Sequence, residues 1–148
     1  MRAPDVVHGT ADATLVHVEG DTAQAYVHNY GTTGILARVT LRLEPAQDWS
    51  AFYASFAGLE PVLPLLAAFA ALEPTPRLVS VDPAGLVASL PPDPALPDGR
   101  ASLRVILDRS TVEVASALVL AAGGRVEDVR PGASAAMRLS TLSSGRAE

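Results

Sequence analysis

The sequence predicts an α+β domain, because segments with the period of a strand and segments with the period of a helix follow one another. Residues 35–43 alternate in the two-residue period of a strand, with apolar side chains along one face. Residues 61–72 repeat apolar side chains at helical spacing. Residues 77–82 have the β-branched composition of another strand. Together these three segments predict a sheet that packs against helices.

The first third of the chain is expected to supply a hairpin and a strand. Residues 14–18 and 23–28 are rich in β-forming side chains, and the turn sequence Glu-Gly-Asp-Thr separates them. We therefore expect these two segments to pair. Residues 1–12 are expected to be a loose lead-in, and a glycine-containing break over 30–34 precedes the strand at 35–43.

Residues 49–72 change their periodicity halfway. The aromatic density of 49–58 favours a strand over a helix capped by Asp48. Pro61 and Pro64 both fit the first turn of a helix, where backbone donors lack partners. Because the helix over 61–72 has no polar face, we expect the rest of the domain, a second copy or a client protein to cover it.

The second half of the chain leaves one alternative open. Residues 83–85 are expected to be a turn and 86–90 the hairpin partner of 77–82, followed by a proline-rich loop. Residues 101–122 form either one long helix, or a strand over 103–107 and a helix from Ser110. Their β-branched side chains argue against the single helix.

The end of the chain is expected to add one strand and a tail. Gly123 and Gly124 end the preceding helix in either case, and 125–130 reads as a short last strand. With 148 residues, the chain is long enough for one domain with a hydrophobic core. We expect a single α+β domain over 1–132 and a flexible Ser-, Ala- and Gly-rich tail over 133–148.

Composition and charge exclude several classes of function. The net charge is −5 and the arginines are scattered, whereas a protein that binds nucleic-acid phosphates needs a basic face. The absence of cysteine excludes disulfides and thiolate metal sites. The N-terminus lacks the apolar run of a signal peptide, and 61–72 is too short to span a bilayer. We expect a soluble cytoplasmic protein that binds neither nucleic acid nor membrane.

The three histidines do not have the spacing of a metal site. In the expected hairpin His17 lies opposite Gln24 and His28 lies opposite Ala13, so the two imidazoles are far apart. His8 lies in the lead-in, and no His-x-x-His or His-x-x-x-His pair occurs. We expect all three histidines at the surface and no metal ion.

No segment has the pattern of a catalytic or cofactor site. Ser110 lacks the G-x-S-x-G elbow and the histidine base that a serine nucleophile needs, and a helix cap at Asp108 or Ser110 accounts for the same residues. Glu127 and Asp128 are adjacent in an extended segment and point to opposite faces. The glycines are too sparse for a phosphate-binding loop. We therefore expect no enzyme, no catalytic residue and no cofactor.

Between residues 47 and 90 the order of the elements resembles the YbjN-like family, whose fold is close to that of type III secretion chaperones. The likeness rests on Asp-Trp-Ser-Ala-Phe-Tyr-Ala-Ser-Phe-Ala as a third strand and Val-Leu-Pro-Leu-Leu-Ala-Ala-Phe-Ala-Ala-Leu as a helix. Arg-Leu-Val-Ser-Val-Asp and Leu-Val-Ala-Ser-Leu supply the following hairpin, and 103–122 the closing helix. That fold opens with a helix, however, and residues 1–22 show none.

The resemblance implies a strongly bent antiparallel β-sheet flanked by helices, commonly dimeric, that works by binding other proteins. It carries no catalytic residue across. The first functional hypothesis is therefore a non-catalytic, chaperone-like or adaptor-like module that acts as a homodimer and binds a client protein. Since aromatic side chains dominate interface hot spots, we expect the contact residues to be Trp49, Phe52, Tyr53, Phe56, Leu66 and Phe69.

The alternative hypothesis takes 103–107 as a strand. The order is then βαβ-βαβ after an N-terminal hairpin, a ferredoxin-like plan with strands at 35–43, 77–82, 102–107 and 125–130. Such a domain resembles an ACT-type regulatory domain that senses a small ligand. The conformation of 102–109 separates the two hypotheses, because an extended segment contradicts the chaperone-like plan.

Overall fold

The chain folds as two compact units in a computed structural model that describes residues 2–28, 30–43 and 45–143. The first unit is Met1–Ala46 and the second is Gln47–Glu148. This division differs from the single domain expected over 1–132. The reason is that the strand at 35–43 pairs within the first unit and not with the sheet of the second.

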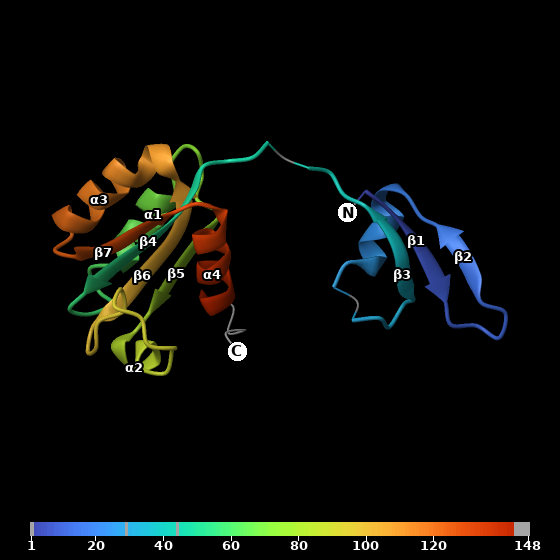
Figure 1. Ribbon diagram of the computed structural model, residues 1–148, viewed down its shortest axis with the longest axis horizontal. Helices are drawn as coiled ribbons and strands as arrows, with labels where there is room; N and C mark the ends of the chain where they lie inside the picture. The colour runs from blue at the N-terminus through green and yellow to red at the C-terminus, as the bar shows by residue number, and fades with distance from the viewer. Residues whose placement is uncertain (1, 29, 44, 144–148) are drawn as a thin grey trace. The chain divides into compact units, whose positions relative to one another are not determined.

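The first unit is a small antiparallel sheet with one 3-10 helix (Figure 1). Its elements are β1 (Ala3–His8), β2 (Thr14–His17), η1 (Gly20–Tyr26) and β3 (Ile35–Thr40), and the strand order is β2-β1-β3. The segment expected as a loose lead-in is therefore the central strand.

The hairpin expected between 14–18 and 23–28 is wrong. Residues 23–26 belong to η1, and β2 pairs with β1 instead, with His17 opposite Asp5. Local turn chemistry explains the difference. Gly20 adopts a φ of +63°, and the Thr22 hydroxyl donates to the Glu19 carbonyl at 2.7 Å, so the chain turns into a helix rather than back along β2.

The second unit is a four-stranded antiparallel sheet with helices on both faces (Figure 1). The strand order is β5-β6-β4-β7. Its elements are β4 (Trp49–Phe56), α1 (Leu63–Ala70), β5 (Leu78–Asp82), α2 (Ala84–Val87), β6 (Ala101–Asp108), η2 (Arg109–Thr111), α3 (Val112–Ala121), β7 (Arg125–Pro131) and α4 (Ala133–Ser143). The expected α+β class, with antiparallel sheets flanked by helices, is confirmed.

The connectivity of β4 to β7 is that of the ferredoxin-like plan, with β4 as its first strand rather than 35–43. The segment 101–108 is extended and lies between β5 and β4. The single helix over 103–122 is therefore wrong, and the strand followed by a helix is right. The Asp108 carboxylate accepts a hydrogen bond from the Ser110 backbone N–H at 3.0 Å, so the predicted cap at this position starts η2 and α3.

Two further segments differ from expectation. Residues 84–87 form the short helix α2, and the antiparallel partner of β5 is β6 rather than 86–90. Pro83 is the N-cap residue of that helix, and the Leu86 N–H donates to its carbonyl at 2.9 Å. The expected tail is the helix α4, because Ala135, Ala136 and Leu139 give it a buried face. Residues 144–148 lie outside the described part of the chain.

Alternation along β4 gives the sheet two buried faces. Phe52, Ala54 and Phe56 point to the α1 and α3 side, where the larger core cluster lies. Ala51 and Tyr53 point to the opposite side, which α2, the connection from α2 to β6, and α4 cover. We call this second side the α4 face. In the described part of the chain, no helix combines the length and the apolarity that crossing a bilayer requires.

Candidate functional site

The helix α4 covers the α4 face only in part. It packs on β4, β6 and β7, with Leu139 fully buried against the sheet. The Gly132 N–H donates to the Trp49 carbonyl at 2.7 Å, which fixes the start of the helix beside the first residue of β4. Because the helix is narrower than the sheet it crosses, an open cavity remains along each of its sides.

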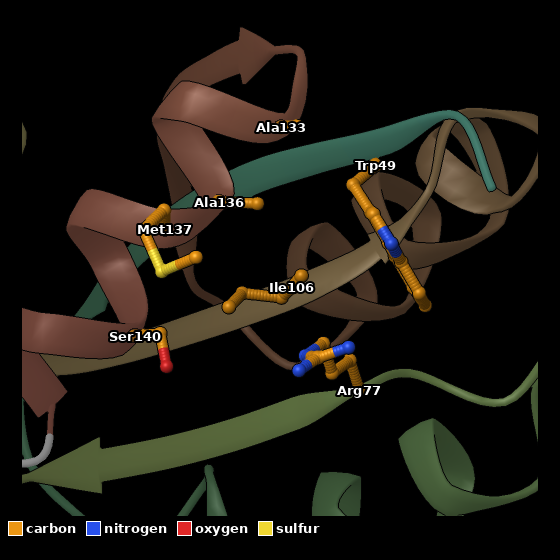
Figure 2. A pocket seen from close by; sticks show the side chains of 7 residues that line it. All are labelled: Trp49, Arg77, Ile106, Ala133, Ala136, Met137 and Ser140. Carbon is orange, nitrogen blue, oxygen red and sulfur yellow. The ribbon is translucent and has the colours of Figure 1, made fainter. Parts of the chain in front are cut away.

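The first cavity, which we call the Trp49 cavity, lies between α4 and the β5–β6 side of the sheet and has a volume of about 210 Å³. Its lining residues are Trp49, Arg77, Ile106, Ala133, Ala136, Met137 and Ser140. Figure 2 shows Ile106 between the side chains from α4 and those of Trp49 and Arg77. The cavity therefore has an apolar floor and a single charged side chain.

The backbone holds Arg77 and Trp49 in place at the Trp49 cavity. The Arg77 N–H donates to the Ile106 carbonyl at 2.8 Å, and the preceding Pro76 restricts the chain that leads into β5. Trp49 pairs with Asp108 in the sheet. Among the described residues, no carboxylate lies within ion-pairing distance of the Arg77 guanidinium. Its charge is thus available to a ligand.

The second cavity, which we call the Tyr53 cavity, lies on the other side of α4 and has a volume of about 390 Å³. Its wall combines an aromatic ring, two prolines, charged side chains and side chains of α4: Tyr53, Pro91, Pro92, Asp93, Arg130, Met137, Arg138, Thr141 and Leu142. Met137 of α4 lines both cavities.

On the α4 face, the Arg130 guanidinium is held by hydrogen bonds to two carboxylates and by a contact with an aromatic ring. Its guanidinium carbon lies 4.6 Å from the centre of the Tyr53 ring, a cation–π distance. Asp93 accepts two of its N–H groups at 2.7 and 2.6 Å, and Asp128 accepts its Nε–H at 2.6 Å. These hydrogen bonds raise the pKa of Arg130, and the bond from Arg130 lowers the pKa of Asp93. Burial raises the pKa of Tyr53.

Arg104 is buried at the centre of the α4 face, with 1% of its surface exposed. Its Nη2 donates to Ser80 at 3.2 Å and pairs with the Asp82 carboxylate. Among the described residues, its Nε and Nη1 have no hydrogen-bond partner. Burial lowers the pKa of Arg104. This side chain lines neither cavity, and we assign it to the structure of the sheet rather than to a site.

The structure does not bring the predicted contact residues together on one surface. Phe52, Phe56 and Phe69 are fully buried in the core beneath α1 and α3, where no partner can reach them. Tyr53 is 3% exposed and lies on the opposite face of the sheet. Trp49 is half-buried at the Trp49 cavity, and Leu66 is 37% exposed on α1.

The histidines lie in the first unit. The His17 imidazole contacts the Asp5 carboxylate through Nδ1 at 2.5 Å and the Glu19 carboxylate through Nε2 at 3.1 Å. His8 lies next to the Tyr26 hydroxyl at 3.2 Å, and His28 is exposed. Within the described residues, no group of three or more His, Cys, Asp or Glu side chains is arranged to hold a metal ion.

Sequence reasoning missed Arg77 and Arg130, two of the arginines that line the cavities. Arg77 directly precedes β5, Arg130 lies near the end of β7, and neither belongs to a motif. Arg130 meets Asp93 across 37 positions of sequence, which no local pattern reveals. Comparison with protein-family models and with curated proteins finds no match to the chain.

Proposed function

We propose that the second unit is a non-catalytic, regulatory domain that binds a small ligand on the α4 face. One observation carries the proposal: α4 leaves an open cavity on each side, and each wall combines an aromatic side chain, apolar side chains and an arginine. Ligand sites have this composition, in which an apolar wall supplies contact area and a few polar groups fix orientation.

The lining chemistry favours binding over catalysis. Ser140 is the hydroxyl of the Trp49 cavity, and that wall contains no histidine or carboxylate that could take its proton. In the Tyr53 cavity the acid is Asp93, whose carboxylate is held by Arg130 and whose pKa is lowered, so it is a weak base. The described wall of the Trp49 cavity therefore offers no base beside its hydroxyl, and the base of the Tyr53 cavity is weakened by Arg130.

Binding can be tested with Met137, because this side chain lines both cavities and is 68% exposed. We would add indole, cyclohexanol, 4-methylpentanoate and 4-methylpentanamide separately to the ¹⁵N-labelled full chain and record amide shifts. We expect at least one compound to shift resonances of α4 and β6. The substitution Met137→Trp adds bulk to the wall that both cavities share and should reduce those shifts.

The matched control is Leu120→Trp, which places the same side chain on the exposed surface of α3, away from the cavities. It should leave the ligand-induced shifts unchanged. The proposal is contradicted if none of the four compounds shifts α4, or if Met137→Trp and Leu120→Trp respond alike.

A second candidate function, self-association, is favoured by the first unit. In its sheet Val7 lies between Leu15 and Ile35, which are 64% and 69% exposed and form an apolar row across the strands. On the same face, Asp5 lies between His17 and Arg38 and gives a row with both signs of charge. Such a face is self-complementary, so we propose that a second copy of the chain covers it.

Sedimentation of the full chain at micromolar concentration tests this second proposal. We expect a dimer that Leu15→Glu converts to a monomer, because the substitution puts a charge into the apolar row. Leu120→Glu is the matched control and should stay dimeric. A wild-type chain that sediments as a monomer contradicts the proposal.

A further inference from the structure

We propose that the Trp49 cavity binds a small apolar monocarboxylate that carries no amino group. The inference rests on the proposed function and names the class of ligand for one of its two cavities. Arg77 would hold the carboxylate, and Trp49, Ile106 and Met137 would contact the apolar body of the ligand. Three features of the described wall support this choice.

The first feature is that the polar side chains of the wall are hydrogen-bond donors. A guanidinium carries donors only, an indole carries one donor, and a serine hydroxyl can donate as well as accept. These groups belong to Arg77, Trp49 and Ser140, and no described residue accepts a side-chain hydrogen bond from them. A ligand group that accepts several hydrogen bonds suits this wall, and a carboxylate accepts the most.

The second feature is the charge. Arg77 has no carboxylate partner among the described residues. Asp108 lies opposite Trp49 in the sheet register, but its carboxylate caps the start of η2. There it accepts the Ser110 backbone N–H at 3.0 Å and the Ser110 hydroxyl at 2.7 Å. The positive charge of Arg77 is therefore the charge that a ligand meets in this cavity.

The third feature excludes amino acids and large ligands. No side chain of the wall is an acid, so an ammonium group would lose its hydration without gaining a partner. The volume of about 210 Å³ is smaller than the cavities that hold drug-sized molecules. A branched or cyclic carboxylic acid of a few carbons fits both limits.

The test compares probes with one shape and different charges. 4-Methylpentanoate, 4-methylpentanamide, 4-methylpentan-1-amine and leucine are titrated into the ¹⁵N-labelled full chain at about pH 7, where the acid is ionised. We expect 4-methylpentanoate to shift the Trp49 indole resonance and the amides of Ala136 and Ser140. The amide should bind about tenfold more weakly, because a charged hydrogen bond is replaced by a neutral one. Leucine and the amine should bind still more weakly.

Substitution of Arg77 tests whether its guanidinium binds the carboxylate of the ligand. Arg77→Met keeps the length of the side chain and should reduce the affinity for 4-methylpentanoate about tenfold, to that of the amide. Arg77→Lys should restore part of the difference. Arg125→Met is the matched control, since Arg125 is an exposed arginine outside both cavities. Arg77 is itself exposed, and the same spectra show that each variant is folded.

The outcomes separate this inference from the proposed function. If 4-methylpentanoate and its amide bind equally well, or if Arg77→Met leaves the affinity for 4-methylpentanoate unchanged, the cavity does not select a carboxylate. It would then be a binding site for neutral molecules. Tight binding of leucine overturns the exclusion of amino acids. If neither acid nor amide shifts the cavity resonances, the carboxylate inference is wrong, and indole and cyclohexanol decide whether α4 binds any ligand.

Discussion

The guanidinium of Arg130 stacks on the ring of Tyr53, with its central carbon 4.6 Å from the ring centre. Tyr53 lies in β4 and Arg130 at the end of β7, so the pair joins two neighbouring strands on the α4 face. Asp93, from the connection between α2 and β6, binds the same guanidinium through both of its carboxylate oxygens. Arg130 therefore holds that connection to the sheet.

Asp93→Asn should destabilise the protein by about 1 kcal/mol at neutral pH. The substitution removes the charged partner of Arg130, whose side chain is only partly exposed. The pKa of Asp93 is lowered below its ordinary value of 3.8 by Arg130. The carboxylate therefore contributes stability above that ordinary value, and the contribution is lost as the pH falls through the folded pKa. Urea unfolding of both proteins measures the difference at each pH.

The matched control for Asp93→Asn is Asp98→Asn. Asp98 is an exposed acid in the same connection, and we expect its substitution to change stability by less than about 0.5 kcal/mol. If the two variants unfold alike, or if the cost of Asp93→Asn is the same at low pH, the bond to Arg130 does not stabilise the fold.

Tyr53 should titrate above the ordinary range of a tyrosine phenol. Burial raises its pKa above the ordinary value of 10.0. Because the folded state favours the neutral phenol, Tyr53 contributes stability below pH 10.0, and that contribution is lost as the pH rises through the folded pKa. Ultraviolet titration of the wild type should show a late phase that Tyr53→Phe lacks. A late phase that persists in Tyr53→Phe contradicts the assignment.

Gly124 allows close packing at the start of β7. A Cβ at this position would overlap the Phe56 ring and lie 2.8 Å from Val119 Cγ1, both of which are core atoms that cannot move freely. We expect Gly124→Ala to cost about 1–3 kcal/mol in urea unfolding. Gly58→Ala is the control, because no atom lies within 4 Å of a Cβ at that position. Equal stability of the two variants would show that the core relaxes around Phe56.

Phe69 and Leu66 lie on the same helix, and the sequence predicts that both lie on one protein-binding surface. Phe69 is fully buried and its ring centre lies 6.4 Å from that of Phe52, whereas Leu66 is 37% exposed on the same helix. Phe69→Ala should destabilise the protein by about 3–5 kcal/mol, and Leu66→Ala by about 1 kcal/mol or less. Chemical denaturation measures both. A small cost for Phe69→Ala contradicts its place in the core.

Local composition predicts strands at 49–58 and 77–82, because these segments are rich in aromatic or β-branched side chains, and the structure has strands at Trp49–Phe56 and Leu78–Asp82. Such composition does not predict which strands pair. The ferredoxin-like plan places a strand at 35–43 in its sheet, whereas the observed strand β3 (Ile35–Thr40) pairs with β1, a segment expected as a lead-in. Strand pairing depends on contacts between distant segments, which a period of two residues does not encode.

Of the residues that line the candidate site, only the aromatic ones could be predicted from the sequence. Trp49 and Tyr53 stand out by type in the sequence, and both line cavities. Arg77 and Arg130 are ordinary surface arginines by sequence, and they acquire a role because α4 folds back over the sheet. The sequence does not predict that helix, because a Ser-, Ala- and Gly-rich end of a chain is typical of a flexible tail. Burial of Ala135, Ala136 and Leu139 against the sheet stabilises the helix.

His17 should have a pKa above its ordinary value of 6.5, because the charged imidazolium donates to Asp5 and to Glu19 at the same time. Its contribution to stability is present below pH 6.5 and is lost as the pH rises through the folded pKa. Proton NMR titration of the imidazole measures this value. Asp5→Asn should lower the His17 pKa more than Glu19→Gln does, since the Asp5 hydrogen bond is the larger cause. The reverse order, or no change in either variant, would show that the carboxylates do not hold the imidazolium in solution.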